Sequence, residues 1–206
     1  MHISKFLLID AALTIAVISF LYLLQGRKTS LFRSPKKEES SKETLYKLPN
    51  KEKLLELEKI SRNSGSGIEF DSLVGDWRFV SIWAKDSDKE DSIFCSLLRF
   101  FSANLQLKKD FAAEHSPKFT IITSIQFGLF TIEFSGAGLL KGEQPYLPFF
   151  FNLIKFKSGS SILLSKSLEE PVEKKKPFFE LIASGKSGEW LSARGQSGAL
   201  FLWLKN

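Results

Sequence analysis

The residues that could carry out chemistry are few in this sequence. It contains one cysteine, Cys95, and two histidines, His2 and His115. A zinc site needs several Cys or His ligands, and acid–base catalysis most often uses a positioned His. His115 lies in the polar stretch AEHSPK without a nucleophile motif nearby, and Cys95 lies in an apolar stretch where a packed thiol is expected. We therefore expect no catalytic residue, no metal site, no cofactor, and a protein that is not an enzyme.

Charge and motif patterns argue against two further classes of function. The sequence has no Gly-x-Ser-x-Gly motif and no Gly-rich phosphate loop. Its net charge is +6, but Lys supplies 23 of the 29 basic residues. Arg is the side chain that reads bases and phosphates with two hydrogen bonds at once, so this Lys bias disfavours a nucleic-acid partner.

Aromatic residues are the unusual feature of the composition, with 20 Phe among 206 residues. This is more aromatic bulk than a small core needs, so we expect it to line or pack against something. Alternate positions of a strand share one face, which selects a set of interior candidates for binding an apolar small molecule or a membrane lipid. They are Trp77, Phe79, Trp83, Phe119, Ile121, Ile125, Phe130, Ile132, Phe150 and Phe201.

The pattern from Ile68 onward predicts a mainly β domain, because short alternating runs are separated by turn signals. Such a series closes most naturally into an antiparallel β-barrel of eight or nine strands. Helices are expected over 50–62, covering one end of the domain, and over 92–102, where apolar residues follow a helical stripe. The expected strands are 73–84, 103–109, 119–127, 129–136, 146–157, 160–166, 178–184, 188–194 and 198–205.

The N-terminal part predicts a membrane anchor. Residues 6–24 are apolar apart from Asp10, which is long enough for a transmembrane helix. A cleaved signal peptide and an apolar element docked on protein remain alternatives. We divide the chain into an anchor (1–26), a charged linker (27–49) and a β-barrel domain (50–206). The basic residues that follow the anchor predict a single-pass protein with its C-terminal domain on the cytoplasmic or stromal side. They could also bind anionic lipid headgroups or act only as a solvated topology signal.

Three stretches carry a resemblance to a known family. They are KEKLLELEKISRNSGSG (51–67), LVGDWRFVSIW (73–83) and LSARGQSGALFLWL (191–204). The second contains the Gly-x-Trp signature of lipocalin-type barrels at Gly75 and Trp77. Together the three stretches resemble the plastid lipid-associated proteins, or fibrillins. The resemblance implies a lipocalin-like barrel that binds lipids, carotenoids or prenylquinones at a thylakoid or plasma membrane of a cyanobacterium, or in a plastid. It also implies a structural pair in which Arg194 packs over Trp77 and bonds backbone carbonyls.

Two functions are therefore expected. The first is non-catalytic binding of an apolar ligand at a photosynthetic membrane. The second is a membrane-anchored interaction or assembly module whose filled barrel docks on a membrane-protein complex. The volume left inside the barrel distinguishes them, since eight strands enclose just enough room for side chains or for one small ligand.

Overall fold

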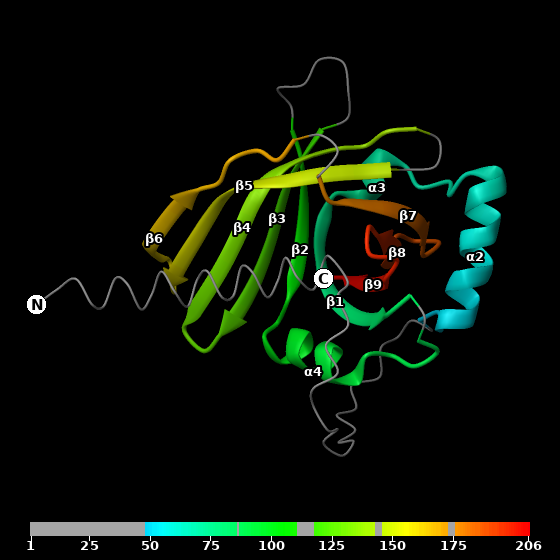
Figure 1. Ribbon diagram of the computed structural model, residues 1–206, viewed down its shortest axis with the longest axis horizontal. Helices are drawn as coiled ribbons and strands as arrows, with labels where there is room; N and C mark the ends of the chain where they lie inside the picture. The colour runs from blue at the N-terminus through cyan, green and yellow to red at the C-terminus, as the bar shows by residue number, and fades with distance from the viewer. Residues whose placement is uncertain (1–47, 86, 111–117, 143–145, 173–175) are drawn as a thin grey trace, which may run out of the picture.

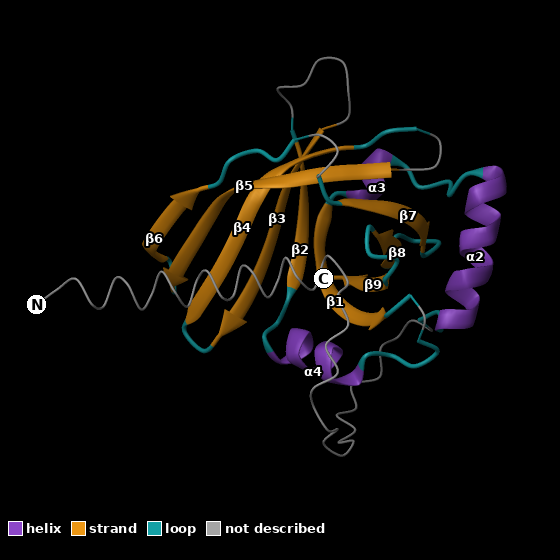
Figure 2. Cartoon of the chain, viewed as in Figure 1, coloured by secondary structure: helices purple, strands orange, loops and turns teal. Residues whose placement is uncertain are grey.

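The structure is a computed structural model that describes residues 48–85, 87–110, 118–142, 146–172 and 176–206, without the side chains of 92–94. The helices are α2 (Lys51–Ser64), α3 (Phe70–Leu73) and α4 (Ser92–Phe100) (Figure 2). The strands are β1 (Gly75–Trp83), β2 (Asn104–Lys109), β3 (Lys118–Phe127), β4 (Phe130–Leu139), β5 (Tyr146–Ser158), β6 (Ser161–Ser167), β7 (Phe178–Ser184), β8 (Trp190–Gly195) and β9 (Leu200–Lys205).

All nine expected strands are present, with ends that differ by up to three residues from the predicted ones. The expected anchor (1–26) and nearly all of the linker lie outside the described residues. Within the part of the chain that is described, no helix is long and apolar enough to cross a membrane.

The strands form one antiparallel sheet that closes into a ring. Their order is β4-β3-β2-β1-β9-β8-β7-β5-β6, and an additional pairing of β4 with β5 completes the ring (Figure 1). The prediction of a mainly β, antiparallel fold of eight or nine strands is therefore confirmed at this level: eight strands make the ring and β6 is attached to it.

Strand β5 belongs to the ring and to an extension of it. Its first residues, Tyr146–Pro148, pair with β7, whereas residues from Leu153 to Ser158 pair with β6 on the same edge. Strand β4 pairs along the other edge of β5 over nearly its whole length. The far halves of β3, β4 and β5 thus continue beyond the ring together with β6. We call this extension the wing (residues 125–127, 130–135, 153–158 and 161–167); it projects away from α2 in Figure 1.

Strand β4 continues past its expected end at residue 136 and contains two glycines, Gly136 and Gly138. A Cβ atom on Gly136 would lie 1.8 Å from the backbone oxygen of Phe150, and one on Gly138 would lie 2.5 Å from Cδ1 of Ile121. The pairing of β4 with β5 is irregular next to Gly136. Glycine within a strand often marks such a close backbone approach. The absence of a side chain at Gly136 therefore allows β5 to lie close against β4 at the point where the wing leaves the ring.

Helix α2 was expected to cover one end of the domain. It packs instead on the outside of the ring. The side chain of Asn50 caps it by accepting a hydrogen bond from the backbone N–H of Lys53 (3.0 Å). Leu54 is fully buried in a cluster that includes Trp83 of β1 and Leu202 of β9. The last strand is therefore apolar on both faces because one face meets the interior of the ring and the other meets α2.

One end of the ring is filled by its own side chains. Trp77 and Phe119 are fully buried there. The indole N–H of Trp77 donates to the carbonyl of Leu73 (2.8 Å), and the ring of Phe70 stacks on Phe119 with 4.1 Å between centroids. Helix α3 thus closes this end, and any space for a ligand lies nearer to α4.

Candidate functional site: an apolar cavity and the wing

An apolar cavity of about 70 Å³ lies within the ring, between the filled end and α4. Its walls come from α4, β1, β2, β3, β5, β7 and β9. The residues that line it are Phe79, Ile82, Leu98, Ala103, Asn104, Leu105, Ile121, Thr123, Phe149, Phe151, Phe179, Phe201 and Trp203. Pockets for drug-sized molecules occupy several hundred Å³, so this cavity accommodates only a short apolar group.

Packed aromatic rings hold the cavity wall in place. Phe201 stacks on Trp203 with 5.3 Å between centroids, and Phe179 meets both rings edge-on. Phe149 in turn stacks on Phe179 at 5.1 Å. Aromatic pairs in such arrangements add stability beyond the area they bury, so we expect a rigid wall with a fixed shape.

The polar atoms at the cavity have partners within the protein. The hydroxyl of Thr123 donates to the backbone carbonyl of Asn104 (2.8 Å), and the hydroxyl of Ser124 donates to Oδ1 of Asn104 (2.8 Å). Among the described residues, no buried side-chain N or O atom lacks a hydrogen-bond partner. The site is therefore suited to select a ligand by shape and hydrophobicity.

Five predicted interior residues belong to the main core cluster around this cavity. Phe79, Ile121 and Phe201 line the cavity itself, whereas Trp77 and Phe119 fill the closed end. The alternation along each strand was sufficient to place these residues on the inner face.

The prediction that Trp83 and Phe150 face the interior is wrong, because both side chains lie on the outer face of the ring. The pairing of β1 with β9 shifts between Phe79 and Ser81, so that Ile82 faces the interior and Trp83 packs with Leu54 beneath α2. In β5, both neighbours of Phe150 line the cavity, and Nζ of Lys176 lies 5.0 Å from the centroid of the Phe150 ring. A one-residue shift moves a side chain to the other face.

The other three predicted residues lie on the wing. Ile125 pairs directly with Ile132, and Ile132 pairs with Phe156, so these side chains share one face of the wing. This apolar face of the wing also carries Phe127, Phe130, Phe134, Ile154 and Leu164. The opposite face carries Glu133, which is paired with Lys155 and Lys157.

The apolar face of the wing is continuous with the cavity. Phe151 lines the cavity, and its ring centroid is 5.6 Å from that of Phe134 on the wing. Phe134 belongs to a cluster with Ile132 and Ile154, against which Phe156 packs. Phe156 stacks on Phe130 at the tip of the wing, with 5.4 Å between centroids. An unbroken series of apolar side chains therefore runs from the cavity to the tip.

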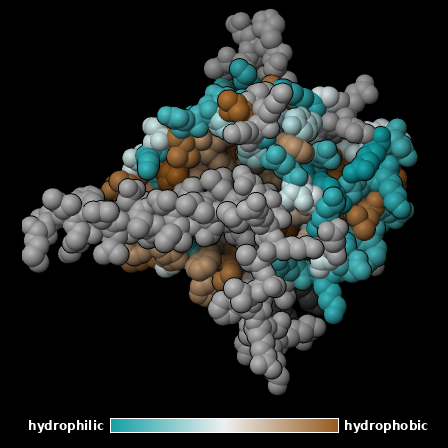
Figure 3. Space-filling model, in the orientation of Figure 1, coloured by the Kyte–Doolittle hydropathy of each residue, from teal (hydrophilic) through white to brown (hydrophobic). Residues whose placement is uncertain are grey.

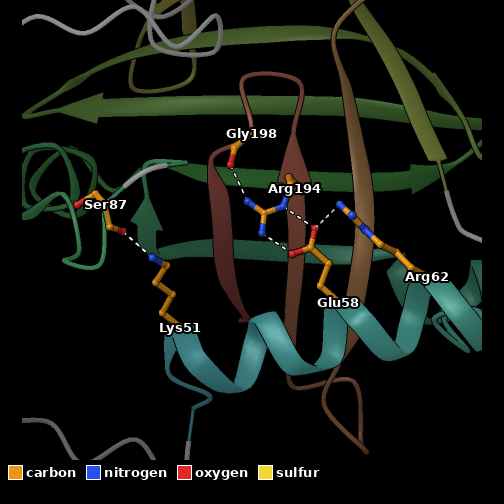
Figure 4. Close-up of polar contacts among 6 residues, drawn as sticks. All are labelled: Lys51, Glu58, Arg62, Ser87, Arg194 and Gly198. Atoms are coloured by element: carbon orange, nitrogen blue, oxygen red, sulfur yellow. Dashed lines mark hydrogen bonds and ion pairs between the residues drawn. The ribbon is translucent and has the colours of Figure 1, made fainter.

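The expected pair of Trp77 and Arg194 is replaced by two other contacts. Lys205 lies over Trp77, with Nζ 5.1 Å from the ring centroid, because these residues are direct partners in the pairing of β1 with β9. Arg194 pairs with Leu200 at the other end of β9. Its Nη1 donates to the carbonyl of Gly198 (2.6 Å), which agrees with the expected backbone bond, and the rest of the guanidinium binds Glu58 of α2 (Figure 4).

Glu58 lies beside a second, polar cavity of about 240 Å³ between α2 and β7. Burial alone would raise the pKa of the Glu58 carboxyl, but the hydrogen bonds and charge of Arg194, with help from Arg62, outweigh burial and hold this pKa below its ordinary value of 4.5. The carboxylate is therefore charged at neutral pH and already engaged, as expected for a structural ion pair.

The thiol of Cys95 is a further reactive group in the described part of the chain. Cys95 is fully buried, and its sulfur accepts a hydrogen bond from the backbone N–H of Ile82 (3.2 Å). Burial is the main cause that raises the pKa of this thiol to about 12. Among the described residues, no group of three or more His, Cys, Asp or Glu could hold a metal ion. His2 and His115 lie outside the described residues.

Sequence reasoning missed several cavity residues. The most important are Ile82, Phe149, Phe151, Phe179 and Trp203. Phe149 and Phe151 were visible as one of two apolar faces of β5, but the sequence gives no sign of which face is inside. Ile82 follows an irregularity of β1 that has no sequence signature.

Comparisons of the chain with family models, with curated proteins and with solved structures found no match.

Proposed function

We propose that this protein is a membrane-tethered, lipocalin-like binding protein that holds one elongated apolar molecule without catalysing a reaction. The observation that carries the proposal is the continuity between the cavity and the apolar face of the wing. Because the cavity has a volume of only about 70 Å³, it accommodates one end of a chain or one ring, and the remainder lies along the wing. The ligand classes that fit are lipids, carotenoids and prenylquinones.

The placement at a photosynthetic membrane rests on the sequence. Residues 6–24 supply the tether, and the resemblance to the fibrillins supplies the ligand classes and the membrane. The ring of eight antiparallel strands with a leading helix is consistent with a lipocalin-like fold. The tether would hold the domain at the bilayer, so that an apolar ligand need not cross water.

The test is to identify what copurifies with the full chain from a photosynthetic host. The protein is extracted in mild detergent, and bound apolar molecules are extracted and identified by mass spectrometry. The matched variants are Ala103→Leu, which adds bulk at the cavity wall, and Ala137→Leu, which adds the same bulk on the outer face of β4. The proposal predicts one ligand class in near-stoichiometric amount, retained by A137L and lost from A103L.

The second candidate is an interaction module, and one observation favours it. The end of the ring at α3 is solid, with Trp77, Phe119 and Leu73 almost completely buried, so most of the interior is occupied by side chains. If no apolar molecule copurifies with the full chain, the first proposal is wrong, and crosslinking in the host membrane would then identify a protein-complex partner.

A further inference from the structure

Exposed large hydrophobic side chains gather at one end of the domain. The described chain has nine of them, and seven lie in α4, at the β3–β4 turn or just after the β5–β6 turn. We call these seven the apolar rim: Leu97, Phe100, Phe127, Leu129, Phe130, Ile162 and Leu163. The two most exposed are Phe100 (78%) and Leu129 (77%).

Backbone contacts join the three parts of the apolar rim. The N–H of Gln126, beside Phe127, donates to the carbonyl of Phe101 at the end of α4 (2.7 Å). The N–H of Gly159 in the β5–β6 turn donates to the carbonyl of Leu129 in the β3–β4 turn (3.0 Å). The rim is therefore one continuous surface. Figure 3 shows hydrophobic surface on the wing side of the molecule, opposite the hydrophilic surface of α2.

The β3–β4 turn is unusually apolar for a turn that faces water, and the β5–β6 turn, although made of Ser and Gly, runs directly into Ile162 and Leu163. Turns are normally rich in Asp, Asn, Gly, Pro and Ser. The β3–β4 turn reads FGLF (127–130), and the β5–β6 turn with the start of β6 reads SGSSIL (158–163). Neither contains a charged residue, so insertion into a low-dielectric layer would carry no cost of desolvating a charge. Contiguous exposed apolar surface marks a site of interaction with protein or membrane.

The described chain begins on the same side of the domain as the apolar rim. Lys51, at the start of α2, donates from Nζ to the carbonyl of Ser87 (2.7 Å) in the loop that leads to α4 (Figure 4). In Figure 1, the start of α2, α4 and the β3–β4 turn lie along the same lower edge of the molecule. The first residues that the structure describes therefore lie at the end of the domain that carries the apolar rim.

The composition of the preceding residues, 1–47, suits a bilayer. They include the 19-residue apolar stretch 6–24, and residues 27–47 carry 7 basic and 3 acidic side chains, a net charge of +4. Basic residues beside an apolar anchor are attracted to anionic lipid headgroups. We propose that the apolar rim inserts into the boundary between headgroups and acyl chains of the bilayer, which orients the wing toward the membrane surface. The proposal does not require a ligand in the cavity.

The test uses the full chain reconstituted in vesicles of phosphatidylcholine and phosphatidylglycerol. An environment-sensitive fluorophore is attached to Leu129→Cys or Phe100→Cys, and to the control Val172→Cys. Val172 is also exposed (65%) but follows β6, which runs away from the rim. Cys95 is fully buried, so the added thiol is the one labelled. Tryptophan fluorescence verifies that each variant is folded.

The proposal predicts that lipids with a nitroxide on the acyl chain quench the label at residue 129 or 100 at least about twofold more than the label at 172. Aqueous iodide should show the opposite preference. Equal quenching by iodide at all three positions would overturn the proposal. Protection of residue 129 from both quenchers would also overturn it, because a protein surface, such as a second copy or residues 6–24, would then cover the rim.

Discussion

Arg194 of β8 and Glu58 of α2 form a two-point ion pair across 136 residues of sequence. Nε of Arg194 donates to Oε1 of Glu58 (2.6 Å), and Nη2 donates to Oε2. The two side chains are only 16% and 10% exposed. Paired donors on a carboxylate give both strength and a fixed geometry. This pair therefore fixes helix α2 on the outside of the ring, in addition to the apolar contacts that Leu54 makes one helical turn earlier.

Replacement of Glu58 by Gln should destabilise the fold, because the Arg194 guanidinium would remain largely buried without its countercharge. We expect a loss of about 2–3 kcal/mol in the free energy of unfolding. Urea unfolding of the full chain in mild micelles, followed by tryptophan fluorescence, measures it. The control is Glu56→Gln, which breaks the exposed pair with Lys53 and should cost less than about 0.5 kcal/mol. Equal losses in both variants would contradict a structural role for the Glu58–Arg194 pair.

The stabilisation by Glu58 should depend on pH in the acid range. Its pKa in the folded protein is lowered from the ordinary value of 4.5. The unfolded chain therefore takes up a proton first as the pH falls, and this favours unfolding. The difference in stability between the wild type and Glu58→Gln should be complete above pH 4.5 and should shrink as the pH falls through the lowered pKa. Unfolding curves between neutral pH and pH 3 would reveal this; a constant difference would refute the assignment.

Gly136, where the wing leaves the ring, should tolerate substitution poorly. A Cβ atom there would overlap the backbone oxygen of Phe150, so Gly136→Ala must push β5 away from β4. We expect a loss of at least about 3 kcal/mol. In the control Gly128→Ala, a Cβ atom meets nothing within 4 Å but φ is +60°, which predicts a cost of only about 1 kcal/mol. The same unfolding assay compares them, and a tolerated G136A would show that β4 and β5 approach less closely.

Cys95 should be almost inert toward thiol reagents in the folded protein. Its thiol is buried, and its pKa is raised to about 12, so at pH 8 on the order of one molecule in 10⁴ carries the reactive thiolate. The rate of reaction with a chromogenic disulfide should rise sharply in denaturing urea. A fast reaction without urea would mean that α4 opens readily from β1.

The sequence was informative about which segments form strands and less so about which side chains face inward. Alternation and turn residues located all nine strands because each signal is local. The inner face of β1 was assigned correctly up to Phe79 and wrongly at Trp83, since the irregularity between Phe79 and Ser81 exchanges the two faces. In β5, both faces are apolar, so only the tertiary pairing distinguishes Phe149 and Phe151 from Phe150.

Long-range partners were the other limit of sequence reasoning. The partner of Arg194 was expected to be Trp77, but the pairing of β8 with β9 places Arg194 at the other end of β9. The actual partner of Arg194 is Glu58, which lies on the buried face of α2 together with Leu54 and Ser61. A carboxylate on such a face requires a cation, although the sequence alone does not show which one.

The double pairing of β5 separates the architecture of the domain into two parts that can evolve independently. The ring closes through Tyr146–Pro148 and β7, whereas the wing grows from residues 153–158 and β6. Two-residue insertions in each strand of a wing hairpin keep the alternation of faces and leave the closure of the ring untouched. We therefore expect relatives of this chain to differ in the reach of the wing while keeping the same ring, and, under the proposed function, to differ also in the length of ligand they hold.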